Sequence, residues 1–167
     1  MVKIYQLTFC IALLIFLQSC YVKQRSNMSF LDRSVVGKEA EVVAVKVPMF
    51  LVKPFIAKEL KKEDDEMIRL AMKKIKSVKL TALSNAKDNT EIRTRFKDFL
   101  RAEQMEEYAS VISDGDRVSI NGQMKKDKVK KLMLGVSSED GDYVFIEVKG
   151  NFTMDEITHA ISSYENN

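Results

Sequence analysis

YVFIEVKGNFT, residues 143–153, is the stretch that most narrowly restricts the fold, because a strand, a break and a helix start follow one another in it. Side chains alternate along residues 143–149, with Val144, Ile146 and Val148 on one side and Phe145, Glu147 and Lys149 on the other. This period of two predicts a β-strand. Gly150 and Asn151 are residues that interrupt strands, so we expect the strand to end there.

The end of the same stretch predicts a capped helix. Thr153 is followed three residues later by Glu156, which is the spacing of a capping box. The helix expected over residues 153–164 has an apolar face formed by Met154, Ile157, Ile161 and Tyr164.

Upstream of this stretch, alternation predicts a strand over residues 78–84. A helix follows, opened by Asp88 and Glu91 as a possible capping box, with a core face of Ile92, Phe96, Phe99 and Leu100.

Two short alternating runs, 108–113 and 117–121, flank a Gly-containing turn and predict a β-hairpin. A shorter helix is expected over residues 127–134, burying Val129, Leu132 and Met133 and stopping at Gly135.

From residue 78 onward, the expected order is strand, helix, strand, strand, helix, strand, helix. Its first six elements have the ferredoxin-like, split βαβ order. The fold class is therefore α+β, a four-stranded antiparallel sheet with two helices on one face and additional flanking helices at 57–76 and 153–164. We expect one buried cluster made of Phe96, Phe99, Val118, Ile120, Val144 and Ile146.

The domain is expected to occupy residues 41–167, beginning with a strand over 41–47. Residues 20–40 show no sustained periodicity and are interpreted as the N-terminus of the mature chain and a tether. The apolar run 49–52 is expected to pack on the domain. The phenylalanines spaced as core residues are Phe50, Phe55, Phe96, Phe99, Phe145 and Phe152.

Residues 1–19 have the pattern of a cleaved signal peptide. Lys3 is the only charge before an eleven-residue apolar run, 7–17, whereas a spanning helix needs about 20 residues. The run ends in LQSC, residues 17–20, which resembles a bacterial lipobox and makes Cys20 the expected lipidation site. The protein is therefore expected to be exported and lipid-anchored to the cell membrane or outer membrane, facing the periplasm or the exterior. An uncleaved short anchor is the alternative.

The amino-acid composition argues against several classes of partner and cofactor. The chain has 27 Lys and Arg against 24 Asp and Glu, a net charge of +3, so it offers no global reason to expect a nucleic-acid partner. Two cysteines and one histidine are too few soft ligands for a zinc or iron–sulfur site, and we expect no metal and no cofactor.

Short motifs along the chain give little further indication of function. His159 is expected on an outward or sideways face of the last helix, and Asp114 with Asp116 lacks the other ligands of a calcium loop. The densest basic cluster is Lys125, Lys126, Lys128, Lys130 and Lys131. It is interpreted as a solvated helix face, with attraction to an anionic membrane surface or polymer as the alternative.

Several of these segments together resemble one known family. They are the lipobox-type start, the helix entering residues 75–78, the helix around Phe96, the hairpin 108–120 and the closing stretch 143–153. Over residues 45–164 the chain resembles exported Bacteroidetes proteins grouped as domain of unknown function 4252. The resemblance implies a small periplasm-facing or surface lipoprotein, and it implies no activity.

Two functions remain open. The first is a non-enzymatic binding or scaffolding module, held at a membrane by Cys20, with a protein or envelope component as its partner. The second is a small envelope hydrolase that uses carboxylates. An exposed apolar patch would favour the first, and a pocket with buried, perturbed acids would favour the second.

Overall fold

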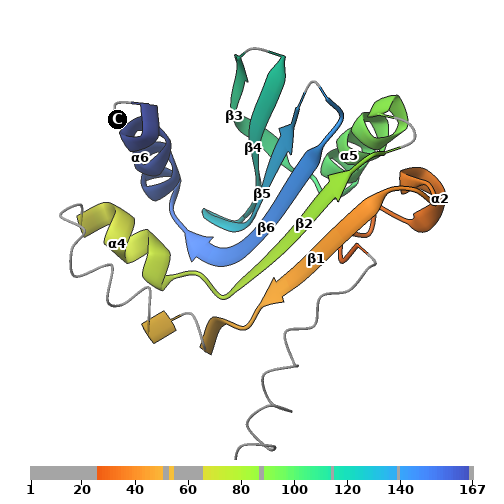
Figure 1. Ribbon diagram of the computed structural model, residues 1–167. Coiled ribbons are helices and arrows are strands. Elements are labelled where there is room, and N and C mark those ends of the chain that lie inside the picture. The colour runs from red at the N-terminus through yellow and green to blue at the C-terminus, as the bar shows by residue number, and fades with distance from the viewer. Residues whose placement is uncertain are drawn as a thin grey trace, which may run out of the picture.

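The computed structural model describes residues 26–50, 53–54, 66–86, 89–113, 115–138 and 140–165. These residues form an antiparallel sheet of six strands and four helices (Figure 1). The strands are β1 Glu41–Val47, β2 Ser77–Ser84, β3 Glu106–Ser113, β4 Asp116–Lys125, β5 Lys128–Ser137 and β6 Tyr143–Phe152. The helices are α2 Arg33–Val36, α4 Glu66–Lys73, α5 Asn89–Ala102 and α6 Met154–Glu165.

The sheet has the order β1-β2-β6-β5-β4-β3, which confirms the α+β class but not the ferredoxin-like topology. The helix expected over 127–134 is wrong, because this stretch belongs to strand β5. Val129, Leu132 and Met133 fit helical spacing, but a strand covered on both faces is also apolar at neighbouring positions. Because β5 replaces the second crossover helix, it lies between β6 and β4. Strand β2 pairs with β6, as in a ferredoxin-like sheet, but it does not pair with β4, which that sheet also requires.

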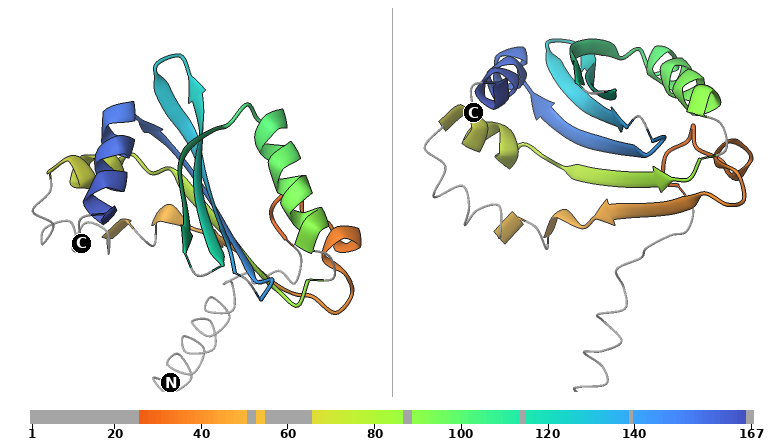
Figure 2. Two further views of the ribbon diagram at one scale, coloured as in Figure 1. Left: turned by 90° about the horizontal axis from the view of Figure 1, so that it is seen from above. Right: turned by 45° about the horizontal axis from the view of Figure 1, so that its top comes forward.

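Helix α5 connects β2 to β3 at the far edge of the sheet and covers one face, here called the α5 face (Figure 2). This face is buried under α5 and the N-terminal segment. Its core residues include Leu83, Ile92, Met133, Tyr143 and Phe145, with Phe96, Phe99 and Leu100 packed against them. The helical periodicity of the α5 sequence therefore identified its core side correctly.

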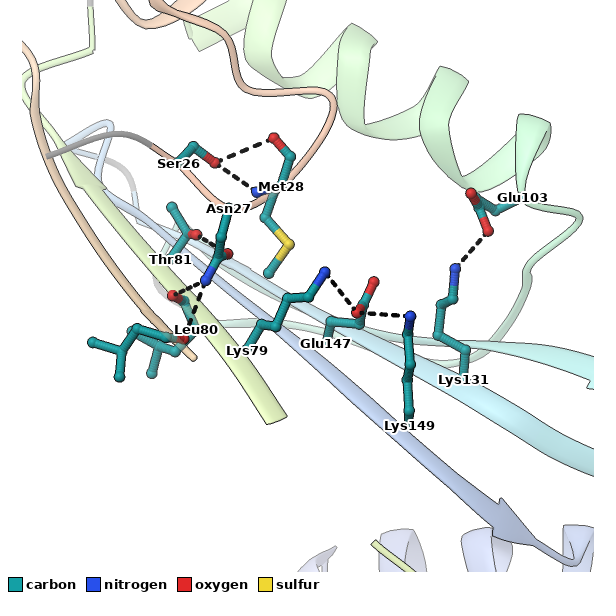
Figure 3. A network of polar contacts seen from close by, with 11 residues as sticks. Ser26, Asn27, Met28, Lys79, Leu80, Thr81, Glu103, Lys131, Glu147 and Lys149 are labelled. Carbon is teal, nitrogen blue, oxygen red and sulfur yellow. Dashed lines mark hydrogen bonds and ion pairs between the residues drawn. The ribbon is translucent and has the colours of Figure 1, made fainter. Parts of the chain in front are cut away.

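Residues 26–36 pack into the same core, although the sequence indicates a tether there. The buried side chains of this segment are Met28, Phe30, Leu31, Val35 and Val36. Asn27 fixes the start of the segment: its Nδ2 donates to the Val45 carbonyl at 3.1 Å, and its Oδ1 accepts from Thr81 Oγ1 at 2.8 Å (Figure 3). Burial without a repeating period explains why the pattern of this segment is uninformative.

The opposite face of the sheet, here called the α6 face, is partly covered by α4 and α6 (Figure 2). Val129, Phe152 and Ile157 are buried there. β6 runs through Gly150 and Asn151 to Phe152, so the expected strand break at Gly150 is wrong. A Cβ at Gly150 would lie 3.0 Å from the Lys74 carbonyl oxygen, so a close approach and not a strand end requires this glycine.

The expected buried cluster is divided between the two faces. Register pairs Ile120 with Leu134 and Leu134 with Ile146, so these residues share the α6 face, whereas Phe96 packs with Phe145 on the other face. Phe50 is 75% exposed, which contradicts its assignment to the core. Of the helix expected at 57–76, the structure shows Glu66–Lys73, and the segment 55–65 with Phe55 lies outside the described residues.

The capping box at the start of α6 is confirmed. The Thr153 N–H donates to Glu156 Oε2 at 3.0 Å, and the Glu156 N–H donates to Thr153 Oγ1 at 3.2 Å. Lys74 Nζ donates to the other carboxylate oxygen, Glu156 Oε1, at 2.5 Å. Burial raises the pKa of Glu156, but hydrogen bonds from Lys74 and Thr153 and the charge of Lys74 outweigh it, so the pKa lies below its ordinary value.

We expect Glu156→Gln to lower the free energy of unfolding by about 1 kcal/mol at pH 7, the usual size of a helix-cap effect. Because the pKa is lower in the folded chain, the carboxylate stabilises the fold above its ordinary pKa, and this stabilisation is lost as the pH falls through the folded-state pKa. The difference between parent and variant in urea unfolding should therefore shrink below about pH 4. Asp155→Asn, which removes one exposed charge from the same turn, is the control; a pH-independent difference for Glu156→Gln would contradict the prediction.

Candidate binding pocket on the α5 face

A pocket of about 340 Å³ opens on the α5 face between α5 and strands β3 to β6. Its volume is at the lower end of the range for small-molecule sites, about 300–1,000 Å³. Helix α5 contributes Arg93, Phe96, Lys97 and Leu100, which share one helical face because of their spacing. The sheet contributes the floor.

Small residues in the sheet create the hollow. Ser119, Gly135 and Phe145 are register partners across β4, β5 and β6, so two of the three side chains in this row are small or absent. A Cβ at Gly135 would lie 2.8 Å from the Phe96 ring and 3.2 Å from Ser119 Oγ. The Phe96 ring can therefore lie against the strand only because residue 135 is glycine.

The walls of the pocket are mainly apolar. Phe96 and Phe145 have ring centroids 4.9 Å apart, and Tyr143 stacks on Phe145 at 5.8 Å. The Tyr143 hydroxyl donates to the Asn89 carbonyl at 3.1 Å, which fixes this ring beneath the start of α5. Ile112, at the β3 side of the pocket, is 69% exposed. An apolar ligand in the pocket would cover the exposed part of the Phe96 ring and Ile112.

Positive charge dominates the rim. Three cations, Arg93, Lys97 and Arg117, line the pocket together with one carboxylate, Glu107. Arg117 Nη2 lies 3.2 Å from Glu107 Oε2, so this pair is internally neutral. Arg93 and Lys97 form no ion pair with another described residue, which leaves two uncompensated cations on α5.

A second polar cluster lies farther along the α5 face (Figure 3). Glu147 is 5% exposed, and its Oε1 lies 3.2 Å from Lys79 Nζ and 3.6 Å from Lys149 Nζ. Neither contact has the geometry of a hydrogen bond, so the three side chains are held by ion pairing. Lys131 Nζ donates to Glu103 Oε2 at 2.5 Å. The lysines thus compensate the acids of this cluster.

The residues singled out from the sequence lie elsewhere or outside the described part of the chain. Cys20 and Asp114 lie outside the described residues. His159 is partly buried on α6. The basic cluster occupies the β4–β5 hairpin and not a helix: Lys130 donates to Asn151 and Lys131 to Glu103.

Sequence reasoning missed the pocket because its residues come from five elements. Two signals were available: small residues inside strands at Ser119 and Gly135, and two cations one helical turn apart at Arg93 and Lys97. Neither signal identifies a pocket until the register places them together.

The described residues contain neither a metal-binding cluster nor a membrane-spanning helix. No three His, Cys, Asp or Glu side chains among them are placed to hold a metal ion. None of the helices that these residues form is long and apolar enough to cross a membrane.

Comparison with known proteins identifies a family but no characterised relative. No curated protein and no solved structure matches the chain. The family described as Domain of unknown function (DUF4252) matches residues 37–160, which include all six strands, α4 and α5. Because this match covers most of the chain, the protein is a member of the DUF4252 family.

Proposed function

We propose that this protein is a lipid-anchored binding module of the cell envelope. We further propose that it binds its ligand in the pocket between α5 and strands β3 to β6, here called the α5 pocket. The observation that carries the proposal is the pocket itself, which combines an apolar floor with a rim bearing two cations, Arg93 and Lys97, that no described acid pairs with. Apolar walls with a few convergent polar groups are typical of ligand sites.

Anchoring through Cys20 places this pocket close to a membrane. The chain from Cys20 to Ser26, the first described residue, can span at most about 22 Å when fully extended. A lipidated Cys20 would therefore restrict the domain to a thin layer beside the bilayer, facing the periplasm or the exterior. Confinement to one surface raises the effective concentration of a ligand or partner on the same membrane.

The alternative, a hydrolase that uses carboxylates, receives less support from the acids that the structure describes. Cleavage of a glycosidic bond by a carboxylate pair, for example, needs two such groups about 5–9.5 Å apart around the substrate. The pocket lining contains one carboxylate, Glu107, and Arg117 pairs with it. The buried acids Glu147 and Glu156 are paired with lysines, and this pairing gives each a structural role.

Replacing Cys20 with alanine is expected to move the protein out of the detergent-extractable membrane fraction. The reason is that the attached lipid would supply the anchoring energy. Cell fractionation followed by immunoblotting measures the change, and Cys10→Ala is the matched control, because Cys10 lies in the apolar run expected to be removed.

Two results would argue against the proposal. A Cys20→Ala protein that remains in the membrane fraction like the parent would show that lipidation is not the anchor. Reproducible turnover in a panel of hydrolase assays, abolished by Glu107→Gln, would favour the hydrolase.

A further inference from the structure

We propose that the α5 pocket binds a small amphipathic anion, namely an apolar chain that carries one carboxylate or phosphate. The inference rests on the proposed function of this pocket and adds the chemical class of the ligand. The apolar chain lies on the aromatic floor, and the anionic group lies at Arg93 and Lys97 on α5.

The floor favours an apolar chain over a polar ligand. Phe96 presents ring surface, Phe145 is buried against it, and Leu100 and Ile112 complete the apolar lining. Ile112 is a large aliphatic side chain at 69% exposure, so covering it removes apolar surface from water. Ser119 Oγ accepts a hydrogen bond from Asn121 Nδ2 at 3.3 Å, so this hydroxyl already has a partner within the protein.

The rim favours a negative charge on the ligand. Arg93 and Lys97 are one helical turn apart on the side of α5 that lines the pocket. Because neither is paired with a described acid, their mutual repulsion is relieved when an anion binds between them. A guanidinium and an ammonium together suit either a carboxylate or a phosphate, and both are held by charge-assisted hydrogen bonds.

The occupied pocket would also be coupled to the N-terminal segment. Phe30 contacts both rings of the floor, with centroid distances of 5.4 Å to Phe96 and 5.0 Å to Phe145. A ligand that packs on Phe96 therefore stabilises a core to which the N-terminal segment contributes through Phe30.

The test uses four probes with the same twelve-carbon chain: laurate, dodecyl phosphate, dodecanol and dodecyltrimethylammonium. Each is titrated by calorimetry, below the concentration at which it forms micelles, into the chain 20–167 carrying Cys20→Ala, which contains every described residue. We expect at least one of the two anions to bind at least tenfold more tightly than the alcohol and the cation.

Two double variants with the same change in net charge test the site. R93E/K97E reverses the two rim cations that α5 contributes, and R95E/R101E reverses two exposed arginines of the same helix that do not line the pocket. We expect R93E/K97E to weaken binding of the anion at least tenfold and R95E/R101E to change it less than twofold. Circular dichroism must show that both variants keep the parent's secondary structure; if R93E/K97E does not, Arg93→Gln with Lys97→Gln replaces it.

The outcomes separate the ligand class from the proposed function. If no probe binds, both the binding role of the pocket and this inference are overturned. If all four probes bind equally and R93E/K97E has no effect, the pocket binds apolar molecules, but the anionic class is wrong. If both double variants weaken binding equally, the anion is attracted by net charge and not by this site, which also overturns the inference.

Discussion

Replacing Phe145 with alanine is expected to lower the free energy of unfolding by about 3–5 kcal/mol, the range for a large aromatic residue removed from a core. Phe145 is 2% exposed. Its ring meets Phe30 edge-on at 5.0 Å, lies 4.9 Å from Phe96 and stacks on Tyr143 at 5.8 Å. The substitution therefore removes the central ring from a cluster formed by the N-terminal segment, α5 and β6.

Urea unfolding followed by far-UV circular dichroism measures this loss. Phe50→Ala is the control, because Phe50 is 75% exposed and its removal should change the free energy of unfolding by less than about 0.5 kcal/mol. A loss below about 1 kcal/mol for Phe145→Ala would show that α5 does not pack on this face of the sheet.

The second large effect is expected from removing both cations beside Glu147. Lys79→Met combined with Lys149→Met should destabilise the fold by about 3 kcal/mol at pH 7, since it leaves a buried carboxylate without a counter-ion. The value is at the low end of the range for a broken buried pair, because the side chains of Lys79 and Lys149 are 27% and 46% exposed.

A triple variant supplies the control for this prediction. Adding Glu147→Met removes the uncompensated charge, so most of the lost stability should return, as found where apolar side chains replace a whole buried ion cluster. Urea unfolding of the double and triple variants provides the comparison. If both are equally destabilised, the effect comes from packing of the lysine stems and not from the buried charge.

Local patterns predicted most elements, and tertiary context explains the failures. Alternation predicted β1, β2, β6 and the β3–β4 hairpin, and helical spacing predicted α5 and α6. β5 was mistaken for a helix because Leu132 and Leu134 point to the α6 face while Met133 points to the α5 face, so both sides of the strand are apolar. A strand covered on both faces lacks the alternation that identifies one from sequence.

The assignment of faces was less predictable. In β6 both alternating sets contain apolar residues, and Glu147 made the set with Phe145 look like the solvent side. Glu147 is buried nonetheless, because Lys79 of β2, its register partner, compensates its charge. The partner lies 68 positions earlier in the chain, and only strand pairing brings the two together.

The N-terminal segment has a mechanical consequence. Asn27 is hydrogen-bonded to β1 and β2, and Phe30 packs between α5 and β6. The segment is therefore attached to the core directly after Ser26. Tension applied at the N-terminal end of the described chain acts directly on the Asn27–Thr81 bond and then on Phe30. A force at this end is transmitted to the aromatic rings beside the pocket, which belong to the same core as Phe30. A force at the end of α6 is transmitted first to the core on the other face of the sheet.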